Sequence, residues 1–115
     1  MSTKYKKSNK ATKHDADKPD LSLLPTGAKR GVAKAFMYGA SKYGRYNYMK
    51  GMEWCRLIGA IDRHISAFNA GQDLDEESGL CHLYHAGASI MMLIEFYEQG
   101  VGTDNRFKRE ENKNE

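Results

Sequence analysis

Three segments of this 115-residue chain carry apolar side chains at the spacing of an α-helix. No segment alternates strictly between apolar and polar residues, as a half-buried strand does. The spacing predicts helices over residues 26–42, 52–70 and 76–98. The second segment has the clearest stripe, which consists of Trp54, Leu57, Ile58, Ile61, Ile65 and Phe68. The fold class is therefore predicted to be all-α, a compact helical bundle of three main helices.

The chain is long enough for one domain and too short for two independent cores. Three helices in about eighty residues bury little apolar surface. The third helix is apolar around much of its circumference, because Met91, Met92 and Phe96 lie outside its main stripe. We therefore expect the bundle to be completed by oligomerisation, as a homodimer or a homotetramer.

The two ends of the chain differ in composition from the middle. Residues 1–17 are predicted to form a disordered basic tail and residues 101–115 a charged disordered tail, on either side of an all-α domain at 18–100. The first fourteen residues hold five lysines and no acid, so the tail accounts for the net charge of +3. Residues 15–100 hold nine basic and eleven acidic side chains and are net negative, so nucleic acid is not an expected partner. No signal peptide or membrane-spanning run is recognisable, which predicts a cytoplasmic protein without a membrane partner.

Three of the four histidines, His64, His82 and His85, lie near a dense group of acids. From His64 to Gly100 there is no Lys or Arg, whereas six carboxylates occur. His82 and His85 share one stripe of the third predicted helix, and His64 lies at the edge of the second helix's apolar stripe. Converging histidines predict acid-base catalysis or a transition-metal site. The alternative is a hydrogen-bonded core His64 with the other two partly exposed.

Among the acids, Asp73, Asp75 and Glu77 are predicted to hold Mg²⁺ or Mn²⁺, because hard cations prefer carboxylate oxygens. The alternative is that these acids cap the third helix and complement its dipole. A calcium loop of the EF-hand type is not indicated, since Gly79 comes one place late and Tyr84 stands where that loop needs an acid.

A basic and aromatic stretch precedes and opens the second helix. Lys42, Arg45 and Arg63 are predicted to neutralise phosphates, and Tyr43, Asn47 and Trp54 to shape a base or sugar pocket. The alternative is a loop, residues 44–51, that is simply anchored by aromatic packing. No phosphate-binding glycine loop, nucleophile elbow or Cys-x-x-Cys motif occurs, which disfavours kinases, dehydrogenases and zinc fingers.

Four runs, KPDLSLLP, GASKYGRYNY, RHISAF and DLDEESGLCHLYHA, together give the chain a wider resemblance. Over about residues 14–100 the sequence resembles the phage dATP/dGTP diphosphohydrolase family, which looks like a compact relative of the MazG-type all-α nucleotide pyrophosphohydrolases. The resemblance implies a helical oligomer, Mg²⁺ or Mn²⁺, a nucleotide ligand and cleavage of a purine dNTP to dNMP and pyrophosphate.

The sequence departs from the MazG pattern, which places paired acids as E-x-x-E on one helix and E-x-x-D on the next. Here the second predicted helix offers only Asp62, and the third offers Glu76 and Glu77 followed by histidines. The leading hypothesis is a metal-dependent purine nucleotide pyrophosphohydrolase in a phage context. The alternative is a non-hydrolysing protein that sequesters a nucleotide or a nucleotide-derived signal.

Overall fold

A computed structural model of the chain describes residues 11, 12, 14 and 16–109. Most of the predicted basic tail, residues 1–17, and the end of the predicted charged tail, residues 101–115, lie outside the described residues. The disorder of both tails stays a prediction.

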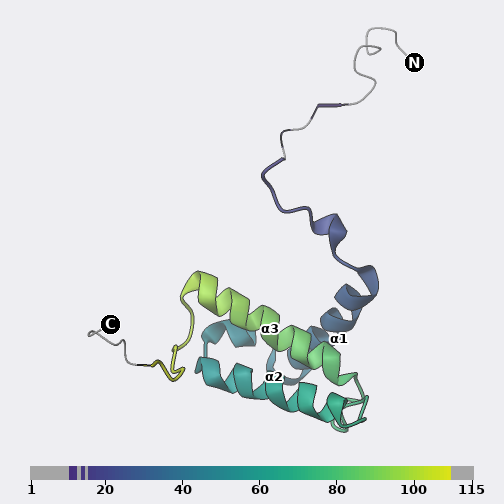
Figure 1. Ribbon diagram of the computed structural model, residues 1–115, viewed down its shortest axis with the longest axis vertical. Helices are drawn as coiled ribbons and strands as arrows, with labels where there is room; N and C mark the ends of the chain where they lie inside the picture. Colours follow the sequence, from purple (N-terminus) through teal and green to yellow (C-terminus); the bar gives the residue numbers. More distant parts are fainter. Residues whose placement is uncertain (1–10, 13, 15, 110–115) are drawn as a thin grey trace.

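The described part of the chain is helical throughout its regular elements (Figure 1). Short 3-10 helices η2 (Leu21–Leu23) and η3 (Asn47–Lys50) accompany three α-helices, α1 (Thr26–Tyr43), α2 (Trp54–Asn69) and α3 (His82–Gln99). Two isolated bridges are the only β-type pairings among the described residues. The all-α prediction is confirmed, and the predicted bounds of the first two helices lie within two residues of those found.

The predicted start of the third helix was wrong. It was placed at residue 76, but α3 begins at His82, and residues 73–81 form a closed loop. The amide of His82 donates to the carbonyl oxygen of Asp73 at 2.9 Å, and the amide of Asp75 donates to that of Leu80 at 2.7 Å. The acids in this loop therefore do not cap the helix, whose N-cap position is Cys81 and has no side-chain cap bond.

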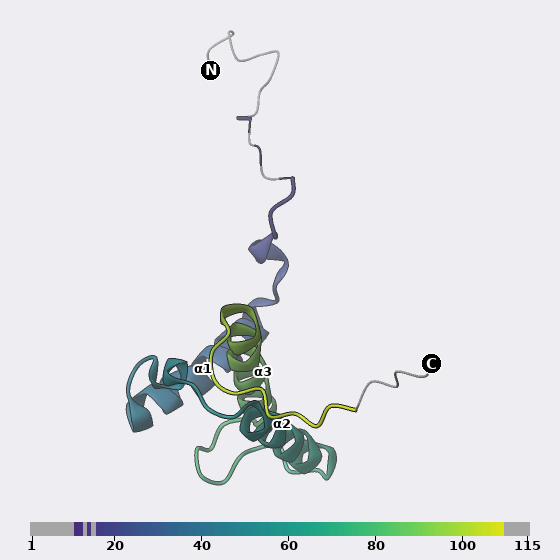
Figure 2. The ribbon, with the colours of Figure 1, turned by 90° about the vertical axis from the view of Figure 1, so that its left-hand side faces the viewer.

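Helix α3 packs against both of the other long helices, with α1 and α2 on different sides of it (Figures 1 and 2). The buried apolar residues are few, and three of the five are alanines: Ala35, Leu57, Ala86, Ala88 and Phe96. Small residues let helix backbones approach closely. Because alanines bury little apolar surface, the hydrophobic core is small, as the length of the chain predicts.

Two glycines mark the closest approach of α1 to α3. A Cβ atom built on Gly31 would lie 2.3 Å from the ring of Tyr84, and one on Gly87 would lie 2.8 Å from Cγ2 of Val32. By contrast, a Cβ on Gly39 of α1 would meet nothing within 4 Å.

Gly31→Ala is expected to lower the free energy of unfolding by about 1–3 kcal/mol, because the new methyl group forces Tyr84 out of a packed contact. Gly39→Ala is the matched control, and it is expected to raise stability by up to about 1 kcal/mol through helix propensity alone. Urea unfolding followed by circular dichroism measures both. A Gly31→Ala variant as stable as the parent protein would show that α1 does not sit against α3 in this way.

The segment after α3 runs beside the start of α2. The amide of Trp54 donates to the carbonyl oxygen of Thr103 at 2.9 Å, and its indole Nε1 donates to that of Val101 at 2.8 Å. The side chain of Asn105 accepts from the amide of Cys55 at 3.0 Å, which supplies a cap that Glu53 does not. Trp54 is thus an anchor for this segment.

Helix α3 also carries an exposed apolar stripe. It comprises Leu83, Ile90, Ile94 and Tyr97, each between 42% and 73% exposed, with Met91 beside it. None of the helices in the described part of the chain combines the length and the apolar character that crossing a bilayer requires.

Candidate functional site

A cavity of about 1090 Å³ lies among α1, the η3 loop, α2 and α3. Its volume is slightly above the range of roughly 300–1,000 Å³ that is usual for small-molecule sites. On α2 it is lined by Arg56, Ala60, Arg63 and His64, a spacing that puts all four on one helix face. Tyr38, Lys42 and the loop that follows α1 also line it.

The three predicted histidines converge at one end of this cavity. The Nδ1 atoms of His64 and His82 are 2.8 Å apart, and the ring of His64 stacks on that of His85 with centroids 4.9 Å apart. His82 is buried, at 5% exposure, whereas His64 and His85 are half-buried and line the cavity. The expected convergence of α2 and α3 on one site is therefore present in the structure.

The loop between α2 and α3 brings Asp75 to the same place. Its Oδ2 accepts hydrogen bonds from the amide and the hydroxyl of Ser78, both at 2.9 Å. Gly79 closes the turn with φ +73°, a conformation that glycine adopts without a steric cost. The Asp-x-x-Ser-Gly sequence therefore builds a local turn that fixes the direction of the carboxylate.

A chain of side chains fixes the tautomer of His82. Its Nε2 lies 2.9 Å from Oε1 of Gln72, and Nε2 of Gln72 donates to Glu76 at 3.1 Å. Because Gln72 presents its oxygen, Nε2 of His82 must carry the proton. The lone pair of His82 is then on Nδ1, which faces His64.

Burial and mutual repulsion keep the cavity histidines neutral. Burial lowers the pKa of His64, and the nearby His85 and His82 lower it further. Burial likewise lowers the pKa of His85, although Asp75 opposes this. Burial tends to raise the pKa of Asp75, but the two hydrogen bonds from Ser78 outweigh it and the pKa is lowered. The site thus combines a carboxylate with neutral imidazoles, which accept protons or bind cations.

Glu77 has another set of partners. Lys42 forms an ion pair with its Oε2, and the hydroxyl of Tyr38 donates to the same oxygen at 2.5 Å. These two contacts hold the pKa of Glu77 below its usual range. Glu77 therefore ties the loop to α1 and partly neutralises Lys42.

Most of the predicted site residues line the cavity, and three do not. Those that do are Lys42, Tyr43, Arg45, Asn47, Arg63, His64, Asp75, Glu77 and His85. Trp54 anchors the segment after α3, and Asp73 is exposed and joins the loop through its backbone. His82 lies behind His64, outside the cavity lining but within the histidine cluster.

Some site residues were not predicted. Arg56 stands seven residues, or about two helical turns, before Arg63, so the two side chains share one face of α2. That spacing is the sequence signal from which Arg56 could have been predicted. Tyr38 stands four residues before Lys42 on α1 and carries the same kind of signal. Gln72 and Ser78 belong to an irregular loop, for which helical periodicity gives no signal.

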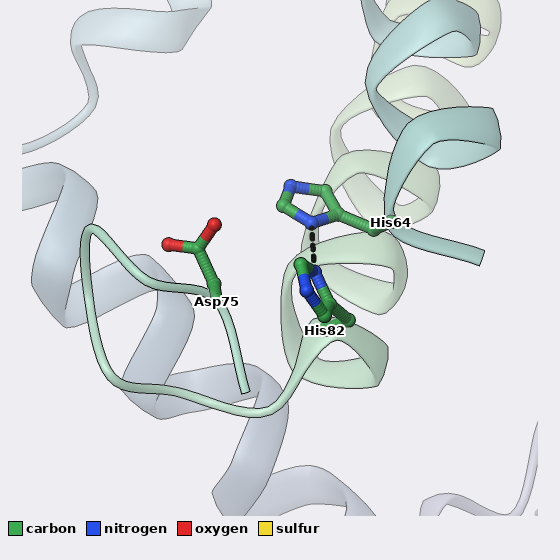
Figure 3. A group of neighbouring side chains, drawn as sticks. All are labelled: His64, Asp75 and His82. Carbon is green, nitrogen blue, oxygen red and sulfur yellow. Dashed lines mark hydrogen bonds between the residues drawn. The ribbon is translucent and has the colours of Figure 1, made fainter. Parts of the chain in front are cut away.

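The donor set at the cluster would suit a cation. One side-chain donor atom from each of His64, Asp75 and His82 lies within 4.8 Å of the others (Figure 3). The carboxylate of Asp75 comes from the loop and the two imidazoles come from α2 and α3. This set differs from the predicted one of Asp73, Asp75 and Glu77 in two of its three members.

Comparison with known proteins identifies the family. The family model described as dATP/dGTP diphosphohydrolase, N-terminal, matches residues 8–106. A curated protein of Salmonella phage PMBT28, named dATP/dGTP diphosphohydrolase, is 33% identical over 94 residues, which are 82% of this chain and 32% of that protein. The chain thus spans about a third of the length of this relative. No solved structure matches. Because the family model matches most of its length, the chain belongs to the dATP/dGTP diphosphohydrolase N-terminal family.

Proposed function

We propose that this chain hydrolyses purine deoxynucleoside triphosphates to dNMP and pyrophosphate, in a phage context and in the host cytoplasm where these nucleotides are found. The name of the phage relative supports the substrate class. The single structural observation that supports the proposal best is the cavity, in which cationic side chains face a histidine and carboxylate cluster.

The cationic side of the cavity suits a triphosphate. Lys42, Arg45, Arg56 and Arg63 all line it, and Arg45 lies over the ring of Tyr46 with 5.5 Å to the centroid. Arginine forks bind phosphate oxygens through two parallel hydrogen bonds. These groups come from α1, its following loop and α2, so they would reach a bound triphosphate from several directions.

The loop after α1 suits the nucleoside. Tyr43 and Tyr46 offer aromatic faces for stacking, and the amide of Asn47 can both donate to and accept from a base edge. Tyr46 adopts a left-handed conformation with φ 63°, which is uncommon outside glycine and turns the chain sharply between α1 and η3. This turn brings Asn47 to the cavity wall.

The histidine cluster suits the chemical step, in which water attacks phosphorus and the bond between the α- and β-phosphoryl groups breaks. Because the hydroxyl of Ser78 donates to Asp75, Nε2 of His85 at 2.7 Å donates to Ser78, which leaves a lone pair on Nδ1 of His85. A neutral imidazole of this kind accepts a proton from water. A bound divalent cation would add neutralisation of phosphate charge.

The test is to incubate the full chain with each of the four dNTPs and a divalent cation, and to measure pyrophosphate and orthophosphate separately. Pyrophosphate from dATP and dGTP, without orthophosphate, is expected. Absence of pyrophosphate with every nucleotide would rule out the enzyme hypothesis.

The second candidate is sequestration of an intact nucleotide. It is favoured by one observation: of the described carboxylates only Asp75 and Glu77 line the cavity, and Glu77 is paired with Lys42. Calorimetry separates the two functions. Tight binding that survives EDTA, with the nucleotide recovered intact, supports sequestration, whereas turnover supports hydrolysis.

We also propose that the active form is a homo-oligomer, a dimer or a tetramer, that covers the apolar stripe on α3. Replacing Ile90 and Ile94 together by glutamate is expected to dissociate it into single chains, because both side chains are more than 40% exposed and would be buried between copies. Sedimentation velocity gives the mass. Ala33→Glu, at an exposed position of α1, is the control. A parent protein that sediments as a single chain would refute the proposal.

A further inference from the structure

We propose that His64, Asp75 and His82 bind a first-row transition-metal dication and that this site disfavours Mg²⁺. The inference rests on the proposed function for the role of the cation and deepens it by naming the cation's class. It departs from the set of Asp73, Asp75 and Glu77 that the sequence predicted.

The geometry brings three donors from three elements to one point. The donor atoms of the triad lie within 4.8 Å of one another, and the two Nδ1 atoms are 2.8 Å apart. Neighbouring ligands at about 2.1 Å from one ion lie roughly 3.0–3.4 Å from each other. The two Nδ1 atoms lie somewhat closer than two ligands of one ion, so a cation would replace the proton shared between them and move the two rings slightly apart (Figure 3).

The kind of donor decides the class of cation. Imidazole nitrogen suits Fe²⁺, Co²⁺, Ni²⁺ and Zn²⁺, whereas Mg²⁺ prefers carboxylate, carbonyl and water oxygens. The triad supplies two nitrogens and one carboxylate, a set found for non-haem transition metals. A set of this kind gives Mg²⁺ only one of the ligands that it prefers.

The surroundings hold two of the ligands in a binding orientation. Gln72 accepts from Nε2 of His82, so the lone pair on Nδ1 points toward His64, and Glu76 in turn holds Gln72. Ser78 holds the carboxylate of Asp75 through two bonds to Oδ2, which leaves Oδ1 for a cation. Partners of this kind typically change metal affinity 10–100-fold.

The carboxylates that would make an oxygen site are engaged elsewhere or lie away. Glu77 is paired with Lys42 and Tyr38. Asp73 is exposed and contributes only its backbone carbonyl to the loop. The oxygen-only alternative would therefore require the loop to open, whereas the triad is already assembled.

The experiment uses the full chain, stripped with EDTA and freed of chelator, without nucleotide. Co²⁺, Mn²⁺ and Mg²⁺ are titrated separately by calorimetry, and Co²⁺ binding is also followed by its visible absorption. One Co²⁺ per chain is expected, with an affinity at least about 100-fold above that for Mg²⁺.

Variants locate the site. His64→Gln and Asp75→Asn are each expected to weaken Co²⁺ binding at least 100-fold, and the half-buried positions tolerate these isosteric changes better than His82 would. His14→Gln and Asp73→Asn are matched controls outside the triad and should bind as the parent protein does. Gln72→Ala is expected to weaken binding 10–100-fold, and Gln99→Ala is its control.

Equal affinity for Mg²⁺ and Co²⁺ would overturn the inference, and so would Co²⁺ affinity that is unchanged in His64→Gln and Asp75→Asn. The two proposals fail separately. Co²⁺ binding at the triad without pyrophosphate release refutes only the proposed hydrolysis. Pyrophosphate release by the parent protein, together with unchanged Co²⁺ affinity in His64→Gln and Asp75→Asn, refutes only the transition-metal site.

Discussion

Asp75→Asn is expected to lower the kcat for pyrophosphate release by roughly 10²–10⁴-fold, with little change in the KM for the nucleotide. Among the described carboxylates, Asp75 is the one that lines the cavity without a lysine partner, and it lies near both His64 and His85. The amide oxygen of asparagine can still accept the bonds from Ser78, so the loop keeps its shape. Only the negative charge is lost.

Asp73→Asn is the matched control, because it makes the same chemical change two residues away on an exposed side chain. It is expected to keep the parental kcat. Circular dichroism melting of both variants checks that the fold is intact. Equal losses in the two variants would mean that the acids of this loop act together and that Asp75 has no special role.

The first two helices could be predicted from sequence because their apolar stripes are long and uninterrupted. For α2 the stripe runs from Trp54 to Phe68, and the helix ends near the predicted stop. The end of α3 was also predictable, because Gly100 adopts the left-handed conformation, with φ 68°, that commonly ends a helix.

The start of α3 could not be predicted, because two local structures compete for the same residues. Acids followed by an apolar stripe are typical of a helix start. Here the Asp75–Ser78 turn, Gly79 and the pairing of Leu74 with Cys81 satisfy the same backbone groups without a helix. Glu77 of this loop also contacts Tyr38 and Lys42 of α1, and contacts between distant residues are invisible in a local pattern.

The convergence of the histidines was predictable from the stripes that carry them, since a helix period fixes the face on which His64 and His85 lie. Their partners were not. Gln72 and Ser78 act through an irregular loop, and Trp54, an aromatic residue beside a basic stretch, turns its indole to the backbone of Val101. Sequence proximity to a binding stretch does not fix the direction of a side chain.

The charge division along the sequence has a structural counterpart. The cationic side chains between Lys42 and Arg63 and the carboxylates of the loop that follows α2 line one cavity. A triphosphate placed there would meet both cations and acid-base groups. The arginines of α2 can therefore be tested independently of the chemistry.

Arg56→Gln combined with Arg63→Gln is expected to raise the KM for dGTP by more than about 100-fold, with a smaller effect on kcat. A hydrogen bond to a charged group contributes about 1.5–3 kcal/mol, and each 1.4 kcal/mol is a factor of about ten in affinity. Both arginines line the cavity from the same face of α2, so they approach the same end of a bound nucleotide. Steady-state kinetics with dGTP and calorimetry with a non-hydrolysable analogue measure the effect.

Arg30→Gln on α1 removes one cation outside the cavity and serves as the control for general electrostatic attraction. Its KM should change little, and the small change should vanish at high salt, because exposed charges at long range are screened. The loss in the double variant should persist at high salt, since direct contacts with phosphate oxygens are lost. If instead all three arginines contribute equally and salt abolishes every difference, the cavity attracts nucleotides by net charge alone and α2 does not form a phosphate site.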